Sequence, residues 1–350
     1  YGDIPYDEAY QFSDNLTPAF ESQEQVLLNI IRDYDAACEV LKASPKPGKS
    51  GLDAIYGDSC STWRKLAGSL RLRALLILTG IDGKYWDDIQ KMFDNPSDYP
   101  VLASNSDNAI VPFGLSDPYR SYFGQSSMTE YSFCGYRLTE QLVGDMVIVD
   151  ADGNTLYNDP RLPIYGSLNG TKWAGTIAGC TNVQRTEAEK RKPSVPNYKV
   201  LVRDDAPYYI MDYAEILFIE AEGVLNGKLN IEGQSARSLY EAAVRASIER
   251  WAPFIRYNSK YRDIQPADID AYLASDIASY EKAESGEGLF KSAEQLLGTQ
   301  KWLALYWTGF NEPYNNWRRT EYPILTIGDG TDYNDYELPT RFCFPNYTCS

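Results

Sequence analysis

The sequence predicts an all-α protein built from helical hairpins, with a long loop-rich block between them. Apolar residues recur with the period of a helix in several long segments, and turn residues separate these segments into pairs. Residues 95–210 carry no long periodic segment. Neither strand–helix alternation nor a glycine-rich phosphate loop is found. With 350 residues, the chain forms one large domain or two ordinary ones.

The first hairpin is expected from helices at 23–43 and 62–79. Ser22 begins a capping-box pattern, and the apolar residues after it follow the 3.6-residue period. The stretch "SPKPGKSG" ends the first helix, and Gly80 is a suitable stop for the second. We expect the two helices to touch. A short helix should follow over 84–94.

The loop-rich block covers 95–210 and is rich in Gly, Pro, Asn, Ser and Tyr. We expect strands only as short hairpins within it. Regular helix returns at 211–226 and 236–251, an antiparallel pair whose small residues let the two backbones approach closely. Two further helices are expected near 267–283 and 291–308.

Charge and composition exclude several function classes. Asp and Glu outnumber Lys and Arg by 49 to 33, and no basic stripe could follow phosphates, so neither nucleic acid nor an anionic membrane surface is expected as a partner. The chain has no histidine, which removes the commonest general base and zinc ligand. We expect no cofactor and no metal. A hydrolase would have to use paired carboxylates.

Cysteines and apolar stretches give little sign of cross-links or membrane spans. The six cysteines lack metal spacing, and Cys343 and Cys349 are close enough for a small loop bridge. The others are expected as unpaired, buried thiols. The longest apolar stretch, near 73–81, is too short to span a bilayer, and no signal peptide is visible. We expect the chain to be cut from something longer.

Several polar motifs could have either a structural role or a catalytic or metal-binding role. "NDPRL" at 158–162 is expected to be a turn with Arg161 paired internally, and "DADGNTLYND" at 150–159 a β-turn instead of a calcium loop. Acidic pairs could serve as glycosidase dyads, but we expect solvated helix faces. The acidic pairs are Asp87–Asp88, Asp204–Asp205 and Glu220–Glu222.

Ordered motifs along the chain resemble the SusD/RagB family of nutrient-binding outer-membrane lipoproteins. The matching stretches are "YGDIPYDEA", "YGDSCSTWRKLAGSLRLRALL", "DPRL", "MDYAEILFIEAEGVLNG", "TQKWLALYWTGFNE", "NWRRTEYP" and "LPTRFCFP". The resemblance implies one domain over 1–350, with tetratricopeptide-like helical hairpins carrying a loop-rich ligand-binding face. It also implies a lipid anchor and a SusC-type TonB-dependent transporter as partner. We expect the anchor region and the C-terminal end of the family to lie outside this chain.

From this resemblance we expect a non-enzymatic glycan-binding protein at the outer-membrane surface. It would deliver oligosaccharide to the transporter. A peptide-binding import lipoprotein, a carboxylate-dependent glycoside hydrolase and a helical-repeat interaction scaffold remain as alternatives. Aromatic residues make up 13% of the chain, and tyrosine suits partly wet pockets as well as helix interfaces.

Two loop segments hold the candidate ligand contacts. "IYGSLNGTKWAGT" at 164–176 sets aromatic rings among residues that can bond sugar hydroxyls, and "DPYRSYFG" at 117–124 offers two tyrosines. Either segment could instead cover the helical core. The candidates are Tyr165, Asn169, Lys172, Trp173, Tyr119 and Tyr122.

The stretch "NEPYNNWRRTEYPIL" at 311–325 sets two arginines beside a tryptophan. An anion site, a cation–π clamp and a buried structural pair are all compatible with it. Glu312 could offer a carboxylate to an arginine. In the family this segment is a fold signature, so we assign Glu312, Trp317, Arg318 and Arg319 a structural role.

Overall fold

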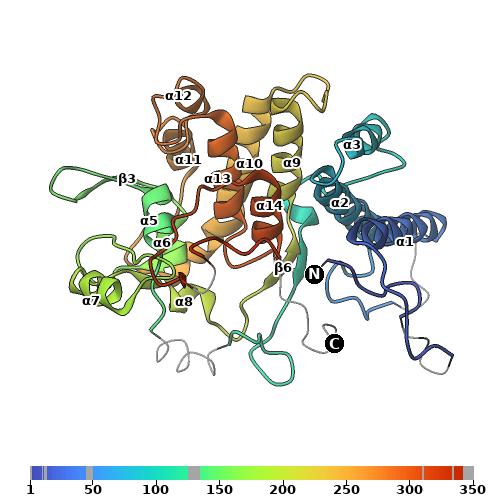
Figure 1. Ribbon diagram of the computed structural model, residues 1–350, viewed down its shortest axis with the longest axis horizontal. Helices are drawn as coiled ribbons and strands as arrows, with labels where there is room; N and C mark the ends of the chain where they lie inside the picture. Colours follow the sequence, from blue (N-terminus) through green and yellow to red (C-terminus); the bar gives the residue numbers. More distant parts are fainter. Residues whose placement is uncertain are drawn as a thin grey trace.

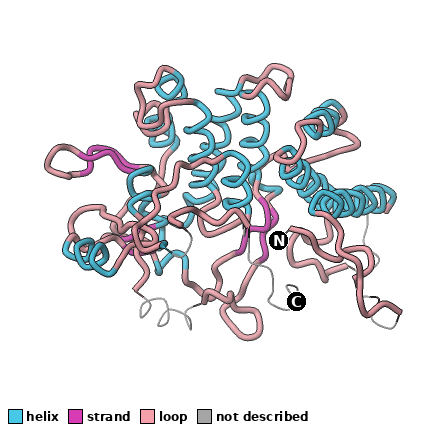
Figure 2. The backbone as a smooth tube through the Cα atoms, in the orientation of Figure 1, coloured by secondary structure: helices cyan, strands magenta, loops and turns pink. Residues whose placement is uncertain are grey.

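The structure is a computed structural model that describes residues 2–9, 11, 14–44, 50–124, 135–309, 311–332 and 335–341. Its described part is mostly helical, as the sequence predicts, with a few short strands (Figure 1, Figure 2). Within this part of the chain, no helix is both long and apolar enough to cross a lipid bilayer.

The first two helices form the expected hairpin at one end of the molecule (Figure 1). Helices α1 (Gln23–Ala43) and α2 (Cys60–Thr79) pack along each other, and α3 (Tyr85–Asp94) packs against α2. The Ser22 side chain accepts a hydrogen bond from the Gln25 amide and so begins α1.

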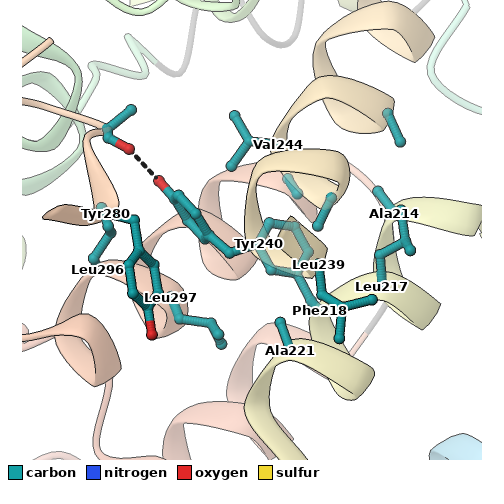
Figure 3. Packing of buried hydrophobic residues seen from close by; sticks show 14 of the residues in the cluster. Ala214, Leu217, Phe218, Ala221, Leu239, Tyr240, Val244, Tyr280, Leu296 and Leu297 are labelled. Carbon is teal, nitrogen blue, oxygen red and sulfur yellow. Dashed lines mark hydrogen bonds between the residues drawn. The ribbon is translucent and has the colours of Figure 1, made fainter. Parts of the chain in front are cut away.

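A second hairpin forms the centre of the fold. Helices α9 (Tyr213–Leu225) and α10 (Ala236–Trp251) pack together, and α13 (Ala293–Ala304) packs against both. Figure 3 shows the apolar cluster between them, in which Phe218 and Tyr240 are fully buried. The Tyr240 hydroxyl donates to the Ala278 carbonyl at 2.9 Å, so this large polar tip is satisfied inside the core.

The helices differ from the expectations in three places. The helix expected near 267–283 is two short helices, α11 (Pro266–Leu273) and α12 (Tyr280–Glu284), because the Ser279 side chain caps a new start. The helix expected to reach residue 308 ends at Ala304, and the following residues turn. The sequence reading missed α14 (Glu312–Thr320), whose polar composition gives no broad apolar stripe.

The block at 95–210 contains more regular structure than expected. The short helices among its described residues are η1 (Asn105–Asp107), α5 (Glu140–Met146), α6 (Leu162–Tyr165), α7 (Asn182–Lys190) and α8 (Tyr198–Leu201). After the central hairpin, the 3₁₀ helix η3 (Ala252–Tyr257) packs against α6 and α8. These helices are too short for sequence periodicity to identify.

Three two-stranded antiparallel sheets are present among the described residues. The pairs are β1 (Ala109–Val111) with β6 (Tyr208–Met211), β2 (Val147–Val149) with β3 (Thr155–Asn158), and β4 (Gly166–Ser167) with β5 (Val195–Pro196). Only the β2–β3 pair is a hairpin, and its turn includes Gly153 at φ 76°. The expected β-turn is therefore confirmed, whereas the expectation of hairpins alone is wrong, since the other two pairs join distant segments.

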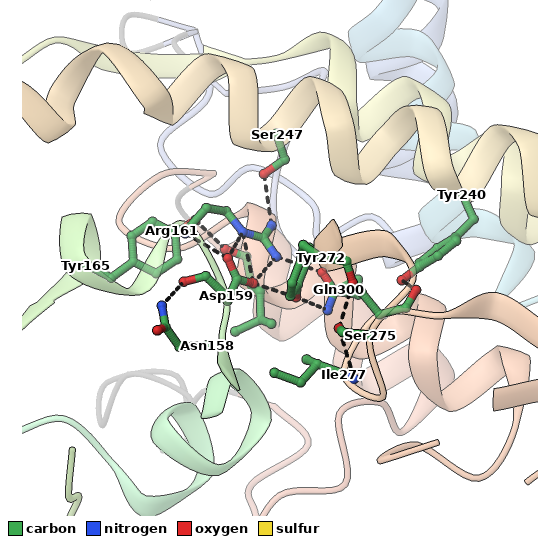
Figure 4. A network of polar contacts seen from close by, with 12 residues as sticks. Asn158, Asp159, Arg161, Tyr165, Tyr240, Ser247, Tyr272, Ser275, Ile277 and Gln300 are labelled. Carbon is green, nitrogen blue, oxygen red and sulfur yellow. Dashed lines mark hydrogen bonds and ion pairs between the residues drawn. The ribbon is translucent and has the colours of Figure 1, made fainter. Parts of the chain in front are cut away.

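A fully buried ion pair fastens the loop block to the helices (Figure 4). Arg161 Nη2 lies 2.6 Å from Asp159 Oδ2, and the same guanidinium donates to Gln300 on α13 and Ser247 on α10. Tyr272 on α11 donates its hydroxyl hydrogen to Asp159 at 2.6 Å. The internal pairing expected for Arg161 is confirmed, and every charge in this network has a partner.

One of the two cysteine expectations can be compared with the structure, for the cysteines that it describes. Cys38 and Cys60 are buried free thiols, as expected, and Cys180 is a free thiol that is half-buried. The possible bridge between Cys343 and Cys349 lies outside the described residues.

Candidate ligand-binding site

An aromatic pocket of about 450 Å³ lies where the C-terminal end of α13 meets the loop block. Its size is within the range of small-ligand sites. Its described lining is uncharged and mostly apolar. The lining residues are Phe123, Leu142, Tyr208, Trp302, Leu305, Tyr306, Trp307, Thr308 and Pro313.

The turn after α13 supplies much of this lining. Trp302 belongs to the last turn of the helix, and the chain then leaves helical geometry at Leu305. Trp307 has a φ of 60°, a left-handed conformation that is unusual for a bulky side chain and indicates local strain. Gly309 follows at a φ of 74°, which glycine adopts without a steric penalty. The fold thus accepts a strained backbone at the residue that brings an indole ring to the pocket.

Tyr165 packs against a residue of the pocket wall and is not itself part of the lining. Its ring stacks on Tyr306 with centroids 4.3 Å apart, and its hydroxyl donates to the Leu303 carbonyl at 2.8 Å. Tyr165 is 0% exposed, so neither face of the ring is open to a ligand. Burial raises the pKa of both phenols well above the ordinary value, so they remain protonated. This placement corrects the expectation of a binding platform at Tyr165.

Arg250 on α10 fixes the end of α13 and the turn. Its Nη2 donates to the Ala304 carbonyl at 2.9 Å, and its Nη1 lies 2.7 Å from the buried carboxylate of Asp212. The same guanidinium lies over the ring of Tyr209, 4.5 Å from the centroid. Because these partners belong to separate elements, the position of the turn is determined by tertiary contacts.

The remaining wall comes from the loop block and β6. The Phe123 ring lies 5.6 Å from the Trp307 ring, and Tyr208 belongs to β6. A narrow extension of about 30 Å³ shares these residues and reaches Trp251. The buried indole N–H of Trp251 has no hydrogen-bond partner among the described residues. Trp251 is itself a lining residue of this extension, and an ordered water can satisfy a buried donor of this kind.

This lining favours stacking over acid–base chemistry. Indole and phenol rings offer flat apolar faces, which suit the apolar faces of sugar rings. No Asp or Glu occurs among the described lining residues, so the pocket shows no carboxylate pair of the kind that glycoside hydrolysis uses. In the described part of the chain, no group of three or more His, Cys, Asp or Glu is placed to hold a metal ion.

Of the two candidates at 117–124, Tyr122 contacts the pocket wall. Tyr119 and Tyr122 are 71% and 85% exposed. The Tyr122 ring makes an edge contact with Phe123, with centroids 5.2 Å apart, and Phe123 lines the pocket. Tyr122 therefore extends the aromatic surface of the pocket outwards.

The candidates at 164–176 do not line the pocket. Asn169 and Lys172 are exposed, and Lys172 donates to the Asp152 carbonyl. Trp173 is half-buried against the cluster that contains Leu138. This segment thus covers part of the core, which was the alternative expected from the sequence.

The 311–325 segment lies mostly in and after α14. The Arg319 guanidinium donates two hydrogen bonds to the Glu222 carboxylate on α9. Arg318 is exposed, and its guanidinium lies 5.6 Å from the centroid of the Tyr314 ring. Trp317 is half-buried and stacks with the Tyr314 ring at 6.2 Å.

Two acidic residues differ from the expectations, one in its ion-pair partner and one in its burial. Glu312 lies 3.9 Å from Arg73 on α2, so its cation is not one of the neighbouring arginines. Glu222 is buried, so the expectation of a solvated carboxylate is wrong for this residue. Asp87 and Asp88 are exposed, as expected.

Sequence reasoning missed the residues that line the pocket. Trp302, Tyr306 and Trp307 fall in "KWLALYW", where three large aromatic rings occur within six residues. That density is the available signal, but the helix expected near 291–308 hides the turn that exposes these rings. Phe123 and Tyr208 come from distant segments and have no shared sequence pattern.

Solved structures with the same fold come from several bacteria. A SusD homologue of Bacteroides fragilis matches with a TM-score of 0.75 at 22% identity, covering 99% of this chain and 72% of the other. A Bacteroides vulgatus outer-membrane protein, described as involved in nutrient binding, has a TM-score of 0.75 at 22% identity, covering 99% and 74%. A chitin-binding SusD homologue of Flavobacterium johnsoniae has a TM-score of 0.70 at 21% identity, covering 94% and 66%. At these identities the likeness shows the fold alone.

The sequence itself assigns the family. No curated protein matches the chain. A family model described as SusD-like, starch-binding and associating with the outer membrane matches residues 1–345. The chain therefore belongs to the SusD-like family of outer-membrane-associated binding proteins.

Proposed function

We propose that this protein binds oligosaccharides in the aromatic pocket and delivers them to a SusC-like TonB-dependent transporter. The uncharged pocket walled by Trp302, Tyr306 and Trp307 carries this proposal. Sugar rings present apolar C–H faces that stack on indole and phenol rings, while their hydroxyl groups bond to polar atoms at the rim. Membership of a family described as starch-binding supports the same ligand class.

Binding without catalysis is part of this proposal. Hydrolysis of a glycosidic bond needs two carboxyl groups placed about 5–9.5 Å apart around the ligand. The described lining supplies neither of them. Incubation with a panel of starch, chitin and other oligosaccharides, followed by an assay for new reducing ends, tests this point. Reducing ends that increase with time would support the hydrolase.

Calorimetric titration identifies the ligand class. We expect at least one neutral oligosaccharide to bind, with an affinity that falls when Trp307 is replaced by alanine. Oligopeptides of similar length, titrated in parallel, test the peptide alternative. Binding of peptides only, or glycan binding that is unaffected by Trp307→Ala, would contradict a glycan site in this pocket.

The proposed location is the cell surface, through a lipid anchor carried by the precursor, with 1–350 acting as one domain. The helical hairpins would dock on the transporter and leave the pocket open to the transported ligand. Crosslinking in intact cells, followed by identification of the linked protein, tests the partnership. Recovery of the chain only as a free monomer would argue against it and favour a different role.

A further inference from the structure

A second pocket, of about 410 Å³, lies between the β4–β5 pair and the segment after η3. We define the basic groove as this pocket. Its lining contains two lysines and, among the described residues, no acidic side chain. The lining residues are Ser167, Leu168, Val195, Pro196, Asn197, Tyr198, Lys199, Asn258, Lys260 and Tyr261.

Two amide side chains hold the walls of the basic groove together. Asn197 Nδ2 donates to the Pro163 carbonyl at 2.8 Å, and Asn258 Nδ2 donates to the same carbonyl at 2.9 Å. Asn197 is 1% exposed, and its backbone N–H donates to the Tyr165 carbonyl at 2.9 Å. The groove is therefore part of the rigid fold beside the buried Tyr165, and does not depend on a loose surface loop.

The two lysines of the basic groove have no acidic partner among the described residues. Lys199 and Lys260 are exposed, and neither forms an ion pair with any described residue. Elsewhere most cations of the described chain are paired, for example Arg262 with Asp268 at 2.6 Å. The whole chain carries a formal charge of −16, yet the described lining of this groove contains two unpaired ammonium groups and no acidic side chain.

The groove also offers an aromatic surface. Tyr261 is 38% exposed and lines both the groove and a neighbouring pocket of about 370 Å³. A ring that borders two pockets can support a sugar on its face, while the ammonium groups lie beside it. Ammonium groups bind carboxylates and sulfates through charge-assisted hydrogen bonds.

We propose that the basic groove binds an anionic unit of a glycan, a ring that carries a carboxylate or a sulfate ester. Lys199 and Lys260 would contact the anionic group, and Tyr261 would support the ring. The inference rests on the proposed function, since it takes the ligand to be a glycan. It adds a second site, distinct from the uncharged aromatic pocket, with a different chemical preference.

Titration of matched ligands tests the proposal. The ligands are a uronate oligosaccharide, a sulfated oligosaccharide and a neutral oligosaccharide of equal length, at about 0.15 M salt, where screening confines charge effects to roughly 8 Å. We expect one charged class to bind about five to ten times more tightly than the neutral one, as two exposed ion pairs allow. The class that binds distinguishes carboxylate from sulfate recognition.

The decisive variant is Lys199→Gln with Lys260→Gln, which keeps side-chain length and removes charge. It should abolish the preference for the charged ligand while leaving neutral binding unchanged. Lys228→Gln removes an exposed lysine outside the groove and should have no effect. Equal affinity for charged and neutral ligands, or a preference that survives the double substitution, would overturn the inference.

The two proposals can fail separately. Trp307→Ala should weaken binding of the neutral oligosaccharide and leave the lysine-dependent binding of the charged ligand unchanged. If no neutral oligosaccharide binds but charged oligosaccharides still bind in a lysine-dependent way, the proposal for the aromatic pocket is wrong and that for the basic groove is supported. If neutral oligosaccharides bind and charged ones show no lysine-dependent preference, only the proposal for the basic groove is wrong.

Discussion

Arg319 on α14 and Glu222 on α9 form a buried ion pair that joins the last described helix to the central hairpin. Arg319 Nη2 lies 2.6 Å from Glu222 Oε2, and Arg319 Nη1 donates to the other carboxylate oxygen. Burial alone would raise the pKa of Glu222, but the adjacent guanidinium lowers it below the ordinary value. Lys301 lies nearby, with its Nζ 3.0 Å from Asn316 Oδ1.

This pair should contribute strongly to stability. Arg319→Ala leaves the Glu222 carboxylate buried without its main cation, and we expect the free energy of unfolding to fall by about 3–5 kcal/mol. Arg318→Ala changes the neighbouring exposed arginine and should cost less than about 0.5 kcal/mol. Urea denaturation of the two variants measures the difference. Similar losses in both would show that the ion pair is not the cause.

Substitution of Tyr165 should affect stability in proportion to what is removed. Tyr165→Phe removes the hydroxyl donor to the Leu303 carbonyl, which keeps only the longer hydrogen bond from the Tyr306 N–H among the described donors, and should cost about 1 kcal/mol. Tyr165→Ala also leaves a cavity next to Tyr306 and should cost about 3–5 kcal/mol. Tyr119→Ala is the exposed control, for which we expect little change in melting temperature. A Tyr165→Ala protein as stable as the parent would contradict the buried position.

Replacing Trp307 should act on ligand binding. We expect Trp307→Ala to remove about 1–3 kcal/mol of oligosaccharide binding free energy, by analogy with stacking on other aromatic platforms. Tyr122→Ala should reduce affinity less, because Tyr122 is not among the described lining residues, whereas Phe123, which its ring contacts, is. Phe20→Ala, an exposed ring outside the pocket lining, is the control for calorimetric titration. Equal effects of Trp307→Ala and Phe20→Ala would remove the pocket from consideration.

Asp145 on α5 predicts a pH dependence of stability. Burial raises its pKa to about 6, although a hydrogen bond from Gln141 acts in the opposite direction. The folded protein therefore holds this proton more tightly than the unfolded chain, whose value is about 3.9. At low pH, Asp145 is protonated in both states and does not lower the free energy of unfolding. As the pH rises above about 4, the unfolded chain loses this proton first, so the free energy of unfolding falls, and the loss is complete above about 6.

Asp145→Asn should therefore raise the free energy of unfolding at about pH 8, by about 1–3 kcal/mol, and have little effect near pH 4. Asp263→Asn removes an exposed carboxylate and provides the control. Chemical denaturation at the two pH values measures both. A stabilisation of Asp145→Asn that is the same at both values would show that it arises from packing and not from ionisation.

Local sequence patterns determined the helical scaffold. The helices at α1, α2, α9, α10 and α13 were predictable because apolar residues repeat every 3.6 positions and side chains such as Ser22 cap their starts. Family motifs in their order predicted the SusD-like membership. Both kinds of information lie in neighbouring residues, and therefore survive in the sequence alone.

Only the tertiary structure decided which aromatic rings are accessible. Tyr165 was expected in a loop and Trp307 in a helix, yet the first is buried and the second lies in a turn that lines a pocket. The difference arises because Tyr306 and Trp251 cover Tyr165, while the turn at Trp307 is fixed by contacts from α10 and the loop block. Burial is a sum over distant neighbours, and the sequence does not specify those neighbours until the chain has folded.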